Sequence, residues 1–203
     1  MKKTAKGEPG YVQYEKKKRT IITVIMFAIP LTIFFTGLAI AGTRKNLFTL
    51  VAILGVLPAA KVAVNWVMIL MQKPADPALV EETRKKAGEL TCGYEMTVTA
   101  YEGRMPLEAV VICGNQVVCV TARGDKEKIP FMEKHMAKIL SGNGYYSVKV
   151  KIFTEKKPFL ERIEQLAKDP QKYREGISFT PDEDYPDLSR EELIKHVLLA
   201  ISL

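Results

Sequence analysis

Two long apolar segments dominate the first third of the chain. Thr20–Ala41 runs for 22 residues without a charge, and Leu47–Met71 follows as a second apolar segment of 25 residues. At 1.5 Å per helical residue, either segment is long enough to cross the hydrocarbon core of a bilayer, which is about 30 Å thick. Only a short polar turn separates them, so the second helix must return antiparallel to the first. The pattern predicts a transmembrane helical hairpin over residues 20–71.

Two polar side chains interrupt the second segment. Lys61 and Asn65 are one helical turn apart and therefore share a face. Three interpretations are open: Lys61 extends its ammonium group to the interface near Trp66, or the pair contacts a partner helix or a second copy, or Lys61 serves transport. Pro30 and Pro58 are expected to kink the two helices.

Beyond the hairpin, the hydrophobic period changes. Residues 72–77 hold two prolines and predict an extended linker, followed by a charged helix over 78–90. Apolar and polar residues then alternate over residues 92–101, as in a half-buried strand. The residues expected on its inner face are Cys92, Tyr94, Met96, Val98 and Ala100.

The remaining pattern completes an α/β domain over residues 78–203. Near-continuous apolar runs on both sides of Gly114-Asn115 predict a hairpin of central strands. Pro130 opens a helix that ends near Gly142, and residues 147–153 alternate as a fourth strand. A helix opened by Pro158 and a last helix capped by Ser189 are expected to follow.

The net charge of +7 is distributed unevenly. Residues 1–19, predicted as a flexible basic tail, hold seven Lys or Arg against two Glu, whereas the turn adds only Arg44 and Lys45. By the positive-inside rule the N-terminus should be cytoplasmic, and two crossings return the C-terminal domain to the cytoplasm. A signal peptide is the rival interpretation, but the apolar run is too long and lacks a cleavage site. The predicted location is the inner (plasma) membrane.

The basic cluster before the first helix is expected to bind anionic membrane lipids. Its members are Lys16, Lys17, Lys18 and Arg19. Outside the membrane region the chain carries 19 basic and 21 acidic residues, so nucleic acid is not the expected partner.

Cysteines and histidines do not predict a metal site or a cofactor. Cys92, Cys113 and Cys119 have no C-x-x-C spacing, and only two histidines could join them. In the predicted hairpin Cys119 lies opposite Val110, with Cys113 on the other face, so these thiols should not pair. We expect His135 to be a packed side chain. An acidic loop is interpreted as a solvated linker rather than a cation site; its residues are Asp182, Glu183, Asp184 and Asp187.

The order of helix, three strands, helix and strand over about residues 78–155 resembles the nuclease-related domain of bacterial proteins, which has a restriction-endonuclease-like fold. In that family an acidic residue starts the second strand and a Glu-x-Lys triplet ends the third, together holding a divalent metal. Here Glu108 occupies the acidic position, but Thr121 and Arg123 stand where the triplet has Glu and Lys. The resemblance implies the fold, and these departures argue against nuclease activity.

Three functional hypotheses follow. The first is a non-catalytic bacterial membrane protein whose cytoplasmic domain acts through a protein partner or through self-association. The second is a metal-dependent nuclease with a rearranged site that uses Glu108 with Glu95 or Asp125. The third is a small transporter subunit that uses Lys61, which requires several copies to enclose a pathway.

Overall fold

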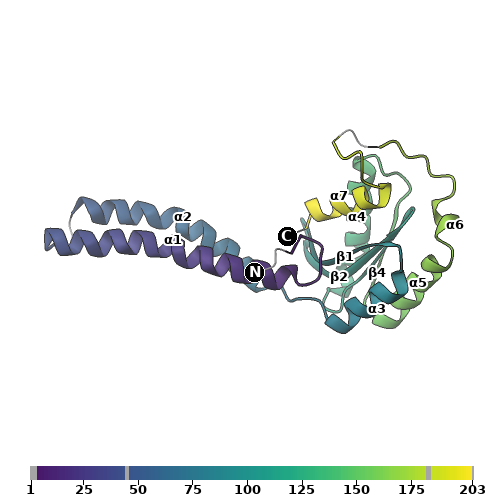
Figure 1. Ribbon diagram of the computed structural model, residues 1–203, viewed down its shortest axis with the longest axis horizontal. Helices are drawn as coiled ribbons and strands as arrows, with labels where there is room; N and C mark the ends of the chain where they lie inside the picture. Colours follow the sequence, from purple (N-terminus) through teal and green to yellow (C-terminus); the bar gives the residue numbers. More distant parts are fainter. Residues whose placement is uncertain (1–3, 44–45, 182–183, 203) are drawn as a thin grey trace. The chain divides into compact units, whose positions relative to one another are not determined.

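The computed structural model describes residues 4–43, 46–181 and 184–202. The chain divides into two compact units, one formed by Val12–Lys73 and the other by Thr4–Tyr11 together with Pro74–Leu203. The first unit holds α1 (Tyr11–Ala41) and α2 (Leu47–Leu70), and the second holds the remaining helices and the sheet (Figure 1). Arg44 and Lys45 of the predicted turn lie outside the described residues.

Helices α1 and α2 form the predicted antiparallel pair. Near one end, the indole N–H of Trp66 donates to the Thr20 hydroxyl over 2.8 Å. At the other end, a side chain built on Gly37 would collide with Phe48, so the helices approach closely where a glycine leaves space. Both helices are long and apolar enough to cross a membrane.

The N-terminal residues differ from the flexible tail predicted for 1–19. Helix α1 begins at Tyr11, because no helix breaker stands between Tyr11 and Thr20 and Glu15 pairs with Lys18 and Arg19 within its own turns. Residues 4–11 belong to the α/β unit, where the Gly7 carbonyl accepts a 2.9 Å hydrogen bond from the Tyr94 N–H.

A four-stranded mixed sheet with the strand order β1-β2-β3-β4 forms the centre of the α/β unit. The strands are β1 (Thr91–Ala100), β2 (Gly103–Cys113), β3 (Gln116–Val120) and β4 (Lys149–Phe153). Neighbouring strands are antiparallel except β3 and β4, which are parallel and are connected through α4 (Ile129–Gly142). The predicted pairing of Cys119 with Val110 is confirmed.

Helices cover both faces of the sheet. On one face α4 and α7 (Arg190–Ala200) contribute Met136 and Leu198 to a buried apolar cluster. On the other face α3 (Pro77–Ala87) and α5 (Lys156–Lys168) contribute Leu79 and Phe159. Two short helices, η1 (Lys126–Lys128) and α6 (Pro170–Arg174), lie in the connections. The predicted mixed α/β class and the order of elements are confirmed.

The predicted inner face of β1 is wrong in one respect. Tyr94 packs with α3 and α5, whereas Met96, two residues later, packs on the opposite face with α4 and α7. Glu95 between them has a left-handed φ of 53°, which breaks the alternation of side chains. Cys92 and Tyr94 therefore lie on one face and Met96, Val98 and Ala100 on the other.

Candidate functional site

The sheet brings three of the sequence-predicted site residues into one row. Tyr94 pairs with Ala109 and Met96 with Leu107, so Glu95 of β1 lies beside Glu108 of β2. The pairing of Ala109 with Val120 in the next ladder places Thr121, which directly follows β3, on the other side of Glu108. The row Glu95, Glu108 and Thr121 runs from β1 across β2 to the residue that follows β3.

Glu108 lies in the middle of this row. Its side chain is 11% exposed and lies 3.9 Å from the Arg123 guanidinium, measured between Oε1 and Nη2. Burial raises the pKa of the Glu108 carboxyl, the positive charge of Arg123 opposes that shift, and the carboxylate of Asp76 adds to it. Arg123 therefore offsets part of the cost of burying the Glu108 charge.

The other candidate carboxylates are used by the fold. Glu95 is buried and its Oε1 accepts a 3.2 Å hydrogen bond from the Ala75 N–H. Asp125 caps η1 and lies 3.4 Å from the Lys128 ammonium group. The Thr121 hydroxyl is buried without a hydrogen-bond partner among the described residues. Within 4–43, 46–181 and 184–202, no three His, Cys, Asp or Glu side chains are grouped so that they could hold a metal ion.

The polar residues of α2 lie on its outside. Lys61 and Asn65 are both exposed, and the Asn65 backbone carbonyl accepts a long 3.5 Å hydrogen bond from Arg19. Lys16, Lys17 and Lys18 lie in the first turns of α1, where Lys17 and Lys18 are exposed. The basic cluster is therefore presented by a helix rather than by a flexible tail.

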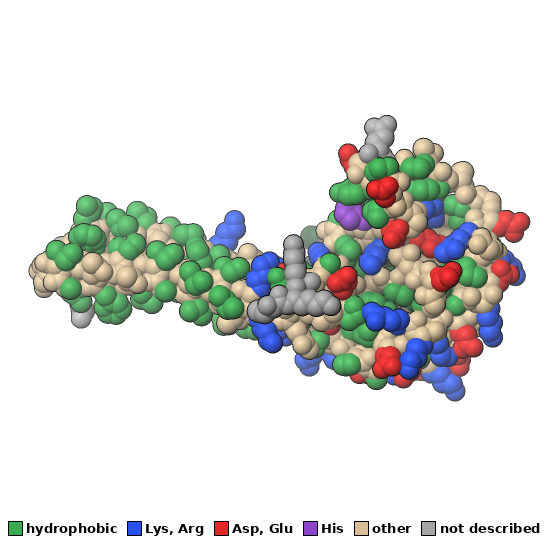
Figure 2. Space-filling model, viewed as in Figure 1, with side chains coloured by type: hydrophobic (Ala, Val, Ile, Leu, Met, Phe, Trp, Pro, Cys, Tyr) green, Lys and Arg blue, Asp and Glu red, His purple; other side chains and the backbone are tan. Residues whose placement is uncertain are grey.

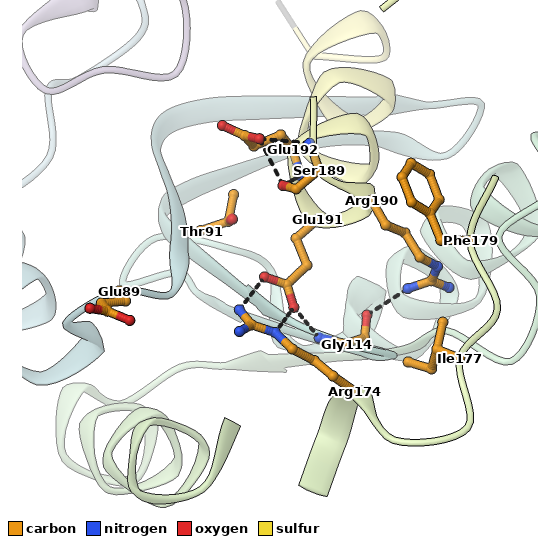
Figure 3. A pocket seen from close by; sticks show the side chains of 10 residues that line it. All are labelled: Glu89, Thr91, Gly114, Arg174, Ile177, Phe179, Ser189, Arg190, Glu191 and Glu192. Atoms are coloured by element: carbon orange, nitrogen blue, oxygen red, sulfur yellow. Dashed lines mark hydrogen bonds and ion pairs between the residues drawn. The ribbon is translucent and has the colours of Figure 1, made fainter. Parts of the chain in front are cut away.

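A polar cavity that sequence reasoning missed lies where the β2–β3 turn meets the start of α7 (Figure 3). Its volume is about 450 Å³. The buried carboxylate of Glu191 accepts a 2.6 Å hydrogen bond from the Gly114 N–H and two more, of 2.9 and 2.8 Å, from Arg174. Arg190 donates to the Gly114 carbonyl and to the Asn115 side chain over 2.9 and 2.7 Å.

The residues that line this cavity have a structural role. Arg174 and Arg190 both donate hydrogen bonds to other residues of the chain. Together with Glu191 they link the end of α6 and the start of α7 to the β2–β3 turn. Asp182 and Glu183 of the predicted acidic loop lie outside the described residues. His135 stacks on Phe131 with ring centroids 6.0 Å apart, as expected for a packed side chain.

Part of this network had a signal in the sequence. Gly114-Asn115 marks the turn and Ser189 marks the helix start, but nothing in the pattern pairs Arg174 with Glu191, because that contact depends on the path of the intervening connection. Comparisons with protein-family models, with curated proteins and with solved structures found no match to this chain.

Proposed function

We propose that this chain is a non-catalytic membrane protein of bacterial type, which acts through a protein partner or through self-association. The observation that carries the proposal is the distribution of exposed large hydrophobic side chains, which gather on α1 and α2 (Figure 2). In the described part of the α/β unit the large hydrophobic side chains that are exposed are only Tyr101, Tyr146, Phe179 and Tyr185. An apolar surface of that extent needs lipid or protein around it.

In this proposal both helices cross the inner (plasma) membrane. The basic residues before the apolar part of α1 support a cytoplasmic N-terminus, held at anionic lipid headgroups by Lys16, Lys17, Lys18 and Arg19. A hairpin that crosses twice leaves the α/β domain in the cytoplasm as well.

The domain itself is proposed to have a restriction-endonuclease-like core that has lost its metal site. The order of elements and the mixed sheet support this fold, and Glu108 takes the family's acidic position. Thr121 supplies no second carboxylate, and an arginine side chain does not serve in proton transfer as a lysine can. In this proposal the Glu108–Arg123 contact has no catalytic role and only offsets part of the cost of burying the Glu108 carboxylate.

Association is proposed to use the face of α2 that carries Lys61 and Asn65. Both side chains are exposed in a helix whose other exposed positions are mostly apolar, and polar groups in lipid favour contact with polar groups of another helix. A second copy or a partner helix would supply that contact.

The test is the mass of the full-length protein extracted from its native membrane in mild detergent, with the co-purifying proteins identified. A defined complex or a stoichiometric partner is expected, and changing Lys61 and Asn65 together to Leu should dissociate it. Leu57→Ala is a matched control, because Leu57 is also exposed on α2 but is apolar. A bare monomer in the native extract would contradict the proposal.

A metal-dependent nuclease is the second candidate, because Glu95 and Glu108 lie side by side in adjacent strands. It predicts nucleic-acid cleavage with Mg²⁺ or Mn²⁺ that Glu108→Ala abolishes. The absence of cleavage by the full-length protein with either metal would exclude this candidate.

A further inference from the structure

A second cavity of about 260 Å³ lies within the α/β unit, beside β1, which is an edge strand of the sheet. Three distant parts of the chain meet there: the N-terminal segment at Gly7, Glu8 and Pro9, the α3–β1 region, and α7. The side chains that matter for its chemistry are Arg84, Lys195, Cys92 and Tyr94. None of them belongs to the acidic row or to the cavity at Glu191.

The two cations of this cavity form no close salt bridge among the described residues, although Lys195 lies near enough to Glu192 to help lower the pKa of that carboxyl. Neighbours on α3 do form such bridges: Lys85 pairs with Glu81 and Lys86 with Glu164. The Lys195 side chain passes close to two glycines. A Cβ added at Gly7 would lie 3.5 Å from Lys195 Cε, and a Cβ added at Gly93 would lie 3.7 Å from the same atom. The end of the Lys195 side chain therefore packs close to the chain at Gly7 and Gly93.

The two neutral polar groups of the cavity add no negative charge, and the Cys92 thiol already donates to the Leu90 carbonyl over 3.4 Å. Burial raises the pKa of the Cys92 thiol and of the Tyr94 hydroxyl, so both keep their protons at neutral pH. The Tyr94 hydroxyl is fully buried next to Cys92 and Arg84. The one carboxylate on the lining, Glu8, already accepts a 3.1 Å hydrogen bond from the Ala5 N–H.

We propose that this cavity binds a phosphate group, with Arg84 and Lys195 as its cationic ligands. Two cations against one carboxylate leave a surplus of positive charge, and a guanidinium beside an ammonium group is a common way to bind phosphate oxygens. The volume admits an ion of a few heavy atoms, because a water molecule occupies about 30 Å³ of liquid.

Two sources could supply this chemistry, a free phosphate ion or a lipid headgroup. Gly7, Glu8 and Pro9 directly precede α1 in the sequence, so the chain that forms one wall of the cavity leads into the first proposed membrane helix. The phosphate site itself does not depend on self-association or on a protein partner.

Cys92 offers a direct probe, because it lines the cavity and is partly exposed, whereas Cys113 and Cys119 are buried. The full-length protein in nanodiscs of phosphatidylcholine is treated with iodoacetamide, and the rate of Cys92 alkylation is followed by mass spectrometry with and without inorganic phosphate. At a phosphate concentration about nine times the dissociation constant, mass action leaves about a tenth of the sites empty, so alkylation should slow about tenfold. Chloride at equal ionic strength is the control for screening.

Arg84→Gln and Lys195→Gln should each remove the protection, and Lys85→Gln, on the same helix but paired with Glu81, should keep it. Arg84→Lys should restore part of the protection, which distinguishes the loss of a charge from a loss of structure.

Nanodiscs with phosphatidylglycerol and no free phosphate form the second arm of the experiment. Protection of Cys92 in these nanodiscs assigns the site to a lipid headgroup, and protection by inorganic phosphate alone assigns it to the free ion. Absence of protection in both arms, equal protection by chloride, or protection that survives both Gln variants would overturn the proposal.

Discussion

Glu191 is the residue on which the cavity network most depends. Its side chain is 9% exposed, and its carboxylate is satisfied by Arg174 and by the Gly114 N–H. Glu191→Ala leaves a partly buried guanidinium and a backbone donor without their acceptor, so the α/β unit should lose about 3 kcal/mol of stability. Hydrogen exchange of peptides from α7 in the full-length protein measures that loss as a lower opening free energy.

The control for that change is Glu81→Ala, which removes the exposed partner of Lys85 on α3. Exposed pairs contribute little, so the change should stay within about 0.5 kcal/mol. Equal effects of the two substitutions would mean that the Glu191 network does not hold α7.

Glu108 should make the stability of the α/β unit depend on pH. Because burial raises its pKa in the folded state, the folded protein holds this proton more tightly than the unfolded chain does. The contribution of Glu108 to stability is therefore fully present below the ordinary glutamate pKa and is lost as pH rises through the raised value. Glu108→Gln should remove this decline and stabilise the unit at pH 7 by about 1 kcal/mol or less.

Arg123→Gln is the matched variant, because it removes the positive charge that opposes the pKa shift. It should destabilise the unit at pH 7 and steepen the loss of stability with rising pH. Unfolding experiments on both variants over acidic to neutral pH provide the comparison. Destabilisation by Glu108→Gln at pH 7 would show instead that the attraction between Glu108 and Arg123 outweighs the cost of burying the carboxylate.

At the scale of elements, the β2–β3 turn has no room for a side chain. Gly114 has a φ of 54°, and a Cβ at this position would collide with the Tyr173 carbonyl at the end of α6. Gly114→Ala combines this collision with the cost of a left-handed residue and should cost about 3 kcal/mol or more. Gly144→Ala meets nothing within 4 Å at a φ of 86°, so only the conformational cost of about 1 kcal/mol remains.

Thermal unfolding of the full-length variants in mild detergent tests this difference. Equal melting temperatures for the two alanine variants would mean that α6 can move away from the turn, and the proposed fastening of the turn to this connection would then be wrong.

Most elements could be predicted because each depends on a local period. The apolar runs gave the two long helices, the alternating and continuous patterns gave the strands, and Ser189 marked the start of α7, where the structure has a full capping box with Glu192. The change of faces in β1 could not be predicted in this way. It depends on Glu95 adopting a left-handed φ while its carboxylate accepts from Ala75, and that contact comes from a residue outside the strand.

The candidate sites show the same limit at the scale of the whole α/β unit. Glu108 and Thr121 could be placed in adjacent strands, because a two-residue turn fixes the register of the hairpin. The cavity at Arg84 and Lys195 could not be foreseen. It requires residues 4–11 to pack on β1, where Gly7 accepts from Tyr94 and Lys6 donates to the carbonyls of Leu199 and Ser202, and a polar N-terminal segment carries no periodic signal.

The proposed two crossings predict which parts of the whole chain face each side of the membrane. In intact cells, a membrane-impermeant maleimide should label Thr43→Cys, because Thr43 is exposed at the end of α1 in the connection between the two helices. It should not label Ser178→Cys in the proposed cytoplasmic domain, nor the natural cysteines of the parent chain, until the cells are permeabilised. Labelling of Ser178→Cys in intact cells would place the domain outside and reverse the orientation. Protection of both engineered cysteines until permeabilisation would mean that the helices do not cross, and their apolar surface would then have to be covered by protein.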